Sequence, residues 1–350
     1  MTREELRAWL ADHPDPDGRT LAAAGLVAPH WPPPWGLGAD AEQQLVIEEE
    51  LLQAGVARPD NQIGIGWAGP TILAGGTEEQ QQRWLPGLLD GSEFWCQLFS
   101  EPEAGSDLAS LRTRAERDGD VYVVNGQKIW STWADRARWG ILLARTDPQA
   151  AKQRGISYLV LDMEAPGIEV RPIVEMTGGT HFTEVFLTDV RVPVDHRIGP
   201  EHGGWALAKV TLANERVSLS EGGVIWGMGP RTDDLFDLVR AGGGIADPVL
   251  RQRAAAVRTH AFVQQVMPES VHDSVKKALS DDHGQDVMAL AKDLRGATGM
   301  LGVQSADAQE ADVWHWGYLF SRALTIGGGT AEIQRTIIGE RLLGLPREPT

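Results

Sequence analysis

The stretch Gln97-Leu98-Phe99-Ser100-Glu101-Pro102-Glu103-Ala104-Gly105-Ser106-Asp107 is the most informative part of this 350-residue chain. It places two hydroxyl groups around a Glu-Pro bend and a Gly-Ser turn, between the apolar pair Phe94-Trp95 and a region with the composition of strands. Hydroxyls and free backbone N–H groups at such a turn can bond the edge of a planar polar ring or a phosphate. A plain surface turn has the same composition, so this stretch alone leaves both interpretations open.

Three further stretches extend the pattern. Asn125-Gly126-Gln127-Lys128-Ile129-Trp130-Ser131-Thr132 follows a strand-like run and offers an aromatic face beside a hydroxyl. Asn214-Glu215-Arg216-Val217 and Gly327-Gly328-Gly329-Thr330-Ala331-Glu332-Ile333-Gln334-Arg335 come later in the chain. In this order, the four stretches resemble four signatures of the acyl-CoA dehydrogenase family of flavoenzymes, over residues 21–347.

The resemblance implies a function. It indicates an FAD-dependent oxidoreductase of lipid metabolism that converts an acyl-CoA thioester to the trans-2-enoyl-CoA. In this family the electrons leave to a separate carrier, such as an electron-transfer flavoprotein. Chain length, branching and ring content of the acyl group are not specified by the sequence.

The spacing of apolar residues changes twice along the chain. Residues 1–93 have helical spacing, with helices expected at 40–54 and 77–89. Residues 94–199 contain short runs typical of antiparallel strands, at 121–124, 139–144, 156–162, 170–172 and 183–187. Residues 200–350 return to helical spacing, at 206–219, 248–266, 286–301 and 331–343.

This order predicts an α+β protein that is mostly α, with segregated layers. The expected domains are a helical N-terminal domain (1–93), a small antiparallel β domain (94–199) and a C-terminal helical bundle (200–350). The acyl-CoA dehydrogenase family is built in the same way, although the resemblance implies that the first helix of its N-terminal domain is missing here.

The composition excludes several classes of protein. The formal net charge of −17 argues against electrostatic binding of nucleic acid, because phosphate contacts need clustered Lys and Arg. No run of about 18 apolar residues predicts a membrane span, and residues 1–6 lack the layout of a signal peptide. Cys96 is the only cysteine, which excludes an internal disulfide and a cysteine-rich metal site. We therefore expect a cytoplasmic protein without a metal.

Removing the α-proton of a thioester needs a desolvated base and donors for the enolate oxygen. The family supplies a glutamate from one of two places. At the commoner place this chain has Gly328, which cannot act as a base; at the other, on a C-terminal helix, it has Glu215. The resemblance therefore makes Glu215 the base, with Arg216 beside it. Most helical glutamates are solvated and paired with a cation, and a plain salt bridge is the alternative for Arg216, but the apolar neighbours of Glu215 favour catalysis.

The resemblance also assigns residues to FAD and to the acyl-CoA. Trp130 is implied to stack on the flavin, Thr132 to lie near its N5 atom, and Ser100 and Ser106 to lie at the ring edge and the phosphates. The other residues implied in FAD binding are Phe99, Gly105, Ser131, Thr330 and Glu332, the last two at the ADP half. The residues implied to contact the acyl-CoA are Ser106, Arg154, Asn214, Gly328 and Gly329, with a solvated loop arginine as the alternative for Arg154.

The glycines at 327–329 suggest a property of the substrate pocket. Three residues without side chains beside the thioester predict a roomy pocket that prefers branched or bulky acyl groups.

Two departures from the family concern the contact between subunits. Relatives carry an Arg-x-x-Phe-Gly segment and a Gly-Gly-Asn-Gly turn that reach the ADP half of a neighbour's FAD. The corresponding stretches here, Arg240-Ala241-Gly242-Gly243-Gly244 and Gly299-Met300-Leu301-Gly302-Val303-Gln304, match neither. A heteromer with a paralogous chain would supply the missing groups. A homo-oligomer remains the alternative if Arg240, Arg251 or Arg253 substitutes locally.

Two other functions remain open at this point. An oxidase or flavin monooxygenase on the same fold would consume oxygen with its substrate. A non-catalytic or partner-dependent subunit of a heteromeric dehydrogenase would explain the missing ADP-contact motifs, but the presence of Glu215, Trp130 and Thr132 argues against it.

Overall fold

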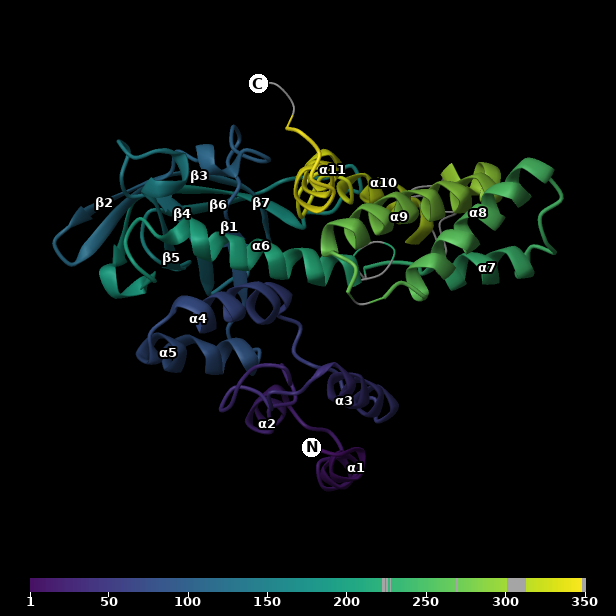
Figure 1. The fold of residues 1–350 in the computed structure, drawn as a ribbon, viewed down its shortest axis with the longest axis horizontal. Helices are drawn as coiled ribbons and strands as arrows, with labels where there is room; N and C mark the ends of the chain where they lie inside the picture. Colours follow the sequence, from purple (N-terminus) through teal and green to yellow (C-terminus); the bar gives the residue numbers. More distant parts are fainter. Residues whose placement is uncertain (222–223, 225, 227, 269, 301–312, 348–350) are drawn as a thin grey trace. The chain divides into compact units, whose positions relative to one another are not determined.

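The computed structural model describes residues 1–350 apart from 222–223, 225, 227, 269, 301–312 and 348–350 (Figure 1). The chain forms two compact units. The first comprises residues 1–173 and 180–211, and the second comprises residues 174–179 and 212–350. The first unit contains the N-terminal helices and the β-sheet, and the second contains the C-terminal helices.

Four of the five N-terminal α-helices begin at side-chain caps, and α4 (Gly69–Gly75) is the exception. The bounds of the other four are α1 (Arg3–Asp12), α2 (Gly18–Ala23), α3 (Ala41–Gln53) and α5 (Glu78–Leu89). The side chains of Thr2, Asp40 and Thr77 each accept a hydrogen bond from the backbone N–H of the third helical residue, whose own side-chain oxygen accepts one from the backbone N–H of the cap residue. The helices predicted at 40–54 and 77–89 are thus present as α3 and α5.

Asn61 connects these helices to the start of the sheet. Its Nδ2 donates to the carbonyls of Leu88 (3.0 Å) and Glu93 (2.9 Å), and its Oδ1 accepts from the N–H of Trp95 (3.3 Å). The buried amide therefore fixes the position at which the first strand begins, just before residues 97–107.

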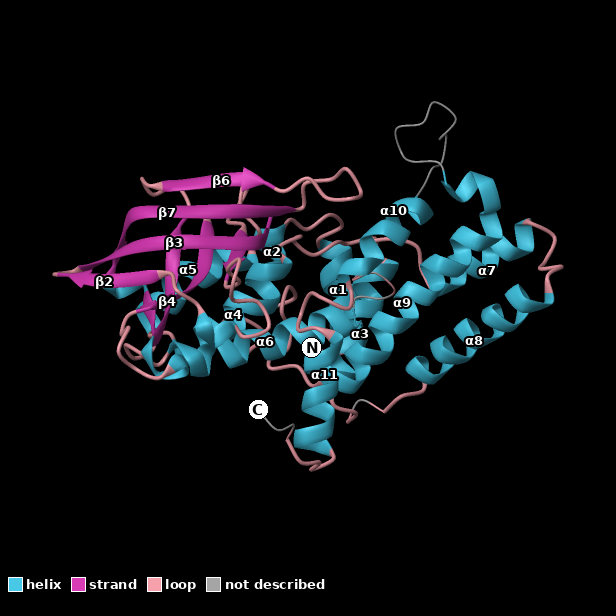
Figure 2. Cartoon of the chain, turned by 90° about the horizontal axis from the view of Figure 1, so that it is seen from above, coloured by secondary structure: helices cyan, strands magenta, loops and turns pink. Residues whose placement is uncertain are grey.

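The described strands form one sheet in the order β6-β7-β3-β2-β4-β5-β8, with β1 paired to β4. Figure 2 shows β6, β7, β3 and β2 in this order. The bounds of the strands are β1 (Trp95–Leu98), β2 (Arg114–Asp118), β3 (Val121–Thr132), β4 (Trp139–Arg145), β5 (Ile156–Asp162), β6 (Ile168–Pro172), β7 (Phe182–Pro193) and β8 (Arg197–Ile198). All five predicted strands are present. Most pairs are antiparallel, as expected, but β4 pairs in parallel with β1 and, at one position, with β2.

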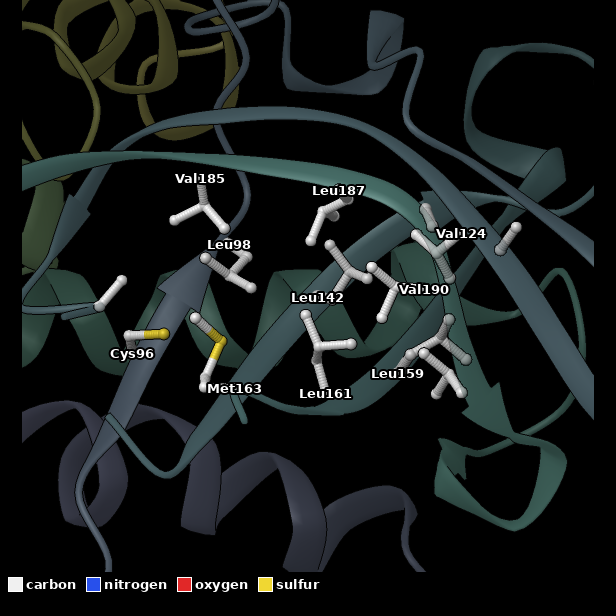
Figure 3. Close-up of a cluster of buried hydrophobic side chains, with 14 of the residues drawn as sticks. Cys96, Leu98, Val124, Leu142, Leu159, Leu161, Met163, Val185, Leu187 and Val190 are labelled. Atoms are coloured by element: carbon white, nitrogen blue, oxygen red, sulfur yellow. The ribbon is translucent and has the colours of Figure 1, made fainter. Parts of the chain in front are cut away.

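The core of the first unit lies against this sheet (Figure 3). Alternate residues of the paired strands supply fully buried apolar side chains, because successive side chains of a strand point to opposite faces. The labelled members in Figure 3 are Cys96, Leu98, Val124, Leu142, Leu159, Leu161, Met163, Val185, Leu187 and Val190. This core fixes the strands from which the two N-terminal signature stretches emerge.

The remaining helices are α6 (Gly204–Glu221), α7 (Thr232–Ala241), α8 (Pro248–Gln265), α9 (Asp273–Arg295), α10 (Val313–Phe320) and α11 (Ala331–Ile337). The first part of α6 belongs to the first unit, where Thr211 Oγ1 lies 2.8 Å from Thr71 Oγ1 and 3.0 Å from the Tyr158 hydroxyl. In the second unit α8 and α9 lie side by side (Figures 1 and 2).

Helix α9 begins earlier than the sequence predicts. The polar run Asp281-Asp282-His283-Gly284 interrupts the apolar spacing, so the sequence indicates a helix only from residue 286. In the structure Asp281 pairs with Lys277, and His283 Nε2 lies 2.8 Å from Thr232 Oγ1. Because Asp281 and the Nε2 atom of His283 find partners inside the unit, the helix continues back to its cap at His272. The predicted end at residue 301 lies outside the described residues.

The order of helices, sheet and helices confirms the predicted α+β architecture. Among the residues that the structure describes, no helix is both long and apolar enough to cross a membrane.

Candidate active site

A buried ion pair holds the loop at residues 97–107. Lys128 Nζ lies 2.9 Å from Glu101 Oε1 and donates to the Phe99 carbonyl at 3.0 Å. Glu101 also accepts from the N–H groups of Arg112 (2.6 Å) and Thr113 (2.9 Å). The two charges are almost fully buried, so the strand β3 and the loop are joined by groups that cannot separate without leaving a buried charge unpaired.

Burial and charge act on the two pKa values of this pair. Burial lowers the pKa of Lys128 to about 8, although the Glu101 charge raises it. Burial raises the pKa of Glu101, but the Lys128 charge and several hydrogen bonds lower it further, so it lies below its ordinary value. The pair is therefore ionic at neutral pH.

The loop at residues 97–107 closes as a tight turn. The backbone groups of Glu101 and Ala104 exchange hydrogen bonds of 3.1 and 3.0 Å. After this turn Gly105 and Ser106 are exposed, and nothing lies within 4 Å of the place where a β-carbon on Gly105 would be. Ser100 is half-buried, and its carbonyl accepts from the Ile129 N–H at 3.0 Å.

Trp130 lies where β3 departs from regular strand geometry. The pairing of β3 with β7 shifts between Lys128 and Ser131, and Trp130 takes the left-handed conformation with φ 60°. This bulge turns the indole outward, so that Trp130 is 57% exposed while Lys128 and Ser131 are buried. A large exposed aromatic in a strained conformation is costly for folding alone, which favours a binding role.

These observations test whether the first unit fits a flavin. Trp130 presents an open aromatic face, and its edge contact with Phe182, at 6.0 Å between ring centroids, holds the indole in place. The Ser131 Oγ is buried without a hydrogen-bond partner among the described residues. Thr132 ends β3 half-buried. An aromatic face, an unpaired hydroxyl and an open glycine turn suit a planar ring with polar edges.

Phe99 and Arg154 differ from the others. The Phe99 ring is buried against Tyr158, with ring centroids 5.9 Å apart, and its place in the FAD cradle stays a prediction. The ring is buried because Phe99 continues β1 and points into the core. Arg154 is exposed on a short turn before β5.

In the second unit, Glu215 lies on α6 and is only 7% exposed. Asn214 and Arg216 are half-buried on the same helix. Burial lowers the pKa of Arg216, while the charges of Glu215 and Asp273 raise it. The predicted base is therefore a desolvated carboxylate beside a cation, and the surface-carboxylate alternative does not describe its environment.

Gly328 lies directly beside Glu215. A β-carbon built on Gly328 would lie 3.7 Å from Glu215 Oε1. The same atom would lie 2.5 Å from Leu219 Cδ1 and 2.8 Å from Lys277 Cε, which is closer than real β-carbons come. Gly328 also has φ 67°, a conformation that favours glycine.

The other two glycines are also enclosed. A β-carbon on Gly327 would lie 2.6 Å from the Trp226 ring, and one on Gly329 would lie 2.8 Å from Gln334 Nε2. The space beside residues 327–329 is thus filled by side chains of the same unit. The roomy pocket inferred from three missing side chains does not follow, because the glycines are needed for close packing.

Gln334 was not singled out from the sequence. Its Nε2 donates to the carbonyls of Gly328 (3.1 Å) and Gly329 (3.2 Å), and the side chain is fully buried. The sequence shows that Gln334 belongs to the C-terminal signature, but it does not show that the side chain is buried. Thr330 accepts from the Ile333 N–H at 3.3 Å and so caps α11, while Glu332 is exposed in the first turn.

The structure describes the first of the two stretches that depart from the family, residues 240–244, and only the start of the second, residues 299–304. Arg240 pairs with Asp237 at the end of α7, and Gly242 follows the helix as its C-cap. Gly299 and Met300 lie in a short 3-10 turn, and the remaining residues of the second stretch lie outside the described chain.

Family models match almost the whole chain. The N-terminal domain of acyl-CoA dehydrogenase matches residues 3–92, the middle domain residues 96–190 and the C-terminal domain residues 202–343. The match and α1 both begin at residue 3, so the expected start near residue 21 and the missing first helix are wrong.

Similar proteins agree with these models. Acyl-CoA dehydrogenase IpdE1 of Mycobacterium tuberculosis is 39% identical over 99% of this chain and 89% of its own length. Acyl-CoA dehydrogenase FadE34 of the same organism is 41% identical over 93% of this chain, but the chain spans about half, 46%, of that relative.

Two solved structures have the same fold. The Tcur3481-Tcur3483 steroid ACAD has a TM-score of 0.82 and is 30% identical, covering 99% of this chain and 97% of its own. The ChsE4-ChsE5 complex from Mycobacterium tuberculosis has a TM-score of 0.78 and is 33% identical, with the same coverage of 99% and 97%. By its sequence, its domains and its fold, this chain belongs to the acyl-CoA dehydrogenase family, whose members are FAD-dependent oxidoreductases that introduce an α,β double bond.

Proposed function

We propose that the chain dehydrogenates an acyl-CoA with Glu215 as the base that takes the α-proton. The observation that supports this most is the proximity of Glu215 Oε1 to the place of a side chain on Gly328, at 3.7 Å. These are the two positions from which the family draws its base. A carboxylate from either one therefore reaches the same point, and in this chain only Glu215 can supply it.

The surroundings of Glu215 suit proton removal. The carboxylate is buried, and a base shielded from water does not pay for losing its hydration shell during the reaction. Arg216 provides a neighbouring positive charge, which stabilises the ionised carboxylate that must accept the proton. FAD, when bound, supplies the acceptor for the β-hydride.

We further propose the residues that hold FAD. Trp130 stacks on the flavin ring, Thr132 and Ser131 offer hydroxyls to its edge, and the turn at Gly105-Ser106 approaches it by backbone and hydroxyl. The ADP half is held by Thr330 and Glu332. The exposed Trp130 indole and the unpartnered Ser131 hydroxyl among the described residues support the first part of this proposal.

The substrate class proposed is a bulky acyl-CoA, such as one with a steroid ring system. One structural neighbour is a steroid ACAD, and this is the support for the proposal, since the packed glycine turn does not argue for bulk. Ser106, Arg154, Asn214, Gly328 and Gly329 remain the proposed contacts to the acyl-CoA.

The experiment that tests this function is an anaerobic reduction assay on the purified protein with a panel of acyl-CoA thioesters. Bleaching of the flavin absorbance by polycyclic acyl-CoAs, and weak bleaching by straight chains of four to eight carbons, is the expected result. A clear optimum at the straight chains would refute the substrate class. A protein that takes up no FAD, alone or with co-expressed paralogues, would refute the function.

We also propose a heteromer with a paralogous chain. One neighbour was solved as a complex of two differently named chains. The arginines that could replace the family's ADP contact are engaged within the second unit: Arg240 with Asp237, Arg253 with Asp293, and Arg251 with the carbonyls of Ile245 and Ala246. Electrons would then leave to an electron-transfer flavoprotein, and the three domains would keep the boundaries 1–93, 94–199 and 200–350.

Mass determination with the FAD-to-chain ratio tests the assembly. The chain expressed alone is expected to hold less than one FAD per chain and to gain FAD with its partner. A stable homo-oligomer with one FAD per chain and full activity would rule out the heteromer.

A further inference from the structure

A buried ion pair in the second unit has no role in the function described so far. Lys277 and Asp281 lie one turn apart on α9, with Nζ and Oδ2 2.5 Å apart, and both side chains are almost completely inaccessible to solvent. Lys277 Nζ also donates to the Leu324 carbonyl at 3.0 Å. The ammonium group is therefore held in place from two sides.

This pair is a neighbour of the proposed base. A β-carbon on Gly328 would lie between the two side chains. It would be 2.8 Å from Lys277 Cε and 3.7 Å from Glu215 Oε1. Lys277 Cε is nearer to that point than any atom of Asp281. The side chain of Lys277 thus lies next to Glu215, while its Nζ is held by Asp281 and the Leu324 carbonyl and lies farther from this point than Cε does.

Stability alone does not explain why these charges are buried. Removing two charges from water is costly, and apolar side chains of the same volume usually stabilise a core as well as a buried pair does. A fixed positive charge near a buried carboxylate does have a chemical effect, because it favours the ionised form.

We infer that Lys277 is a positioning residue for catalysis, whose ammonium group, anchored by Asp281 and the Leu324 carbonyl, keeps Glu215 ionised and ready to accept the α-proton. The inference rests on the proposed role of Glu215 as the base. Lys277 itself does not touch the reacting atoms.

Other charged groups act on the same helix turn. Arg216 lies on α6 beside Glu215, Asp273 lies at the start of α9, and Arg341 follows α11. Burial raises the pKa of Asp281 to about 6, although the Lys277 charge lowers it, so the Asp281 carboxyl is ionised at neutral pH. Lys277 differs from these groups in being completely buried next to Gly328.

Proton removal can be measured apart from flavin reduction. A thioester with a quaternary β-carbon, such as 3,3-dimethylbutanoyl-CoA, has α-protons but no β-hydrogen to lose as hydride. Its α-C–H bond breaks, the electron pair stays on the enolate, the proton passes to Glu215, and a deuteron returns from D2O. Deuterium uptake by the FAD-loaded protein, followed by mass spectrometry as a function of pD, therefore reports the base alone.

Four variants separate the charge from the packing. Lys277→Met keeps the apolar stem and removes the charge, and Asp281→Asn removes the counter-charge. The double variant Lys277→Met/Asp281→Asn removes both charges and leaves no buried charge unpaired, so it remains a test if the single variants fold poorly. Lys276→Met is the matched control, because it makes the same change on the same helix at a partly exposed position.

The expected shifts have opposite signs. Lys277→Met moves the acid limb of the exchange profile, the pD range over which the base becomes protonated, to higher pD by about one unit, the low end of the effect of a nearby opposite charge. Asp281→Asn moves the limb to lower pD, since the ammonium is no longer compensated. The double variant moves it upward by less than Lys277→Met, and Lys276→Met leaves it unchanged.

Two results would overturn the account, and they are distinguishable. If the double variant folds and its acid limb coincides with that of the wild type, Lys277 does not act on Glu215 and the inference fails. If Glu215→Gln exchanges deuterium as fast as the wild type, Glu215 is not the base, and the proposed mechanism fails together with the inference.

Discussion

Glu215 on α6 and Gly328 in the turn before α11 meet at one point, although 113 positions separate them in the sequence: a β-carbon on Gly328 would lie 3.7 Å from Glu215 Oε1. The proposed base and the glycine at the alternative position therefore lie side by side in this chain. Placing a side chain at position 328 would, however, have a structural cost in this chain. Leu219 and Lys277 already occupy the space that a side chain at 328 would need.

Moving the base to position 328 is therefore expected to fail. In Glu215→Gln/Gly328→Glu, the new side chain meets Leu219 and Lys277 and sits at φ 67°, where a non-glycine residue costs about 1–3 kcal/mol. We expect flavin reduction no faster than in Glu215→Gln alone and a lower midpoint of thermal unfolding. Stopped-flow reduction and calorimetry measure the two effects. Recovery of even a tenth of the wild-type rate would show that the turn has room.

The ion pair between Lys128 and Glu101, which holds the loop at residues 97–107, is expected to be important for stability. Lys128→Met leaves the Glu101 carboxylate buried with backbone donors only, and breaking a buried pair in this way costs about 3–5 kcal/mol. Urea unfolding measures the loss, and FAD should dissociate more readily because the loop is released.

Lys152→Met is the matched control for this loop. Lys152 pairs with Asp107 at 2.5 Å, but both side chains are 59% exposed, so its loss should cost less than about 1 kcal/mol. Equal stability of the Lys128 and Lys152 variants would contradict the assigned role. Lys128→Met/Glu101→Gln should regain part of the loss, since no unpaired charge remains.

The sequence was sufficient for the architecture because apolar spacing follows the period of each element. It identified β3 and the aromatic at its end, and the exposed Trp130 agrees with a binding role. It could not identify Lys277 or Gln334, because a lysine and a glutamine in a helix are normally solvated, and only packing against the glycine turn buries them. Packing also explains the error about the three glycines. The sequence shows only that they lack side chains, whereas in the structure Trp226, Leu219 and Gln334 pack into the space beside them.

The protein is expected to lose stability on mild acidification, in part through His196. Burial lowers the pKa of His196, with the Arg83 charge adding to the effect, and its Nδ1 lies 3.0 Å from the Val160 carbonyl. Below the ordinary pKa of about 6.5, His196 binds a proton in the unfolded chain but not in the folded protein. The stability that is present above pH 6.5 is therefore lost as the pH falls. One such group contributes at most about 1.4 kcal/mol per pH unit.

His196→Asn tests this contribution. The amide nitrogen of Asn can replace the ring N–H toward Val160 but does not titrate. The slope of unfolding free energy against pH between 5 and 7 should therefore be shallower in His196→Asn. The exposed His260 on α8 is the control, and His260→Asn should keep the wild-type slope. An unchanged slope in His196→Asn would contradict the prediction.

The most direct test of the account is the anaerobic reduction of bound FAD by an acyl-CoA in Glu215→Gln. The amide is nearly the same shape as the carboxylate but cannot accept the α-proton, so FAD should remain bound while its absorbance bleaches at least ~10²–10⁴ times more slowly than in the wild type, the range for loss of a general base. If the variant keeps more than about a tenth of the wild-type rate, a loss of under ~1.4 kcal/mol, Glu215 is not the base and the central claim is wrong.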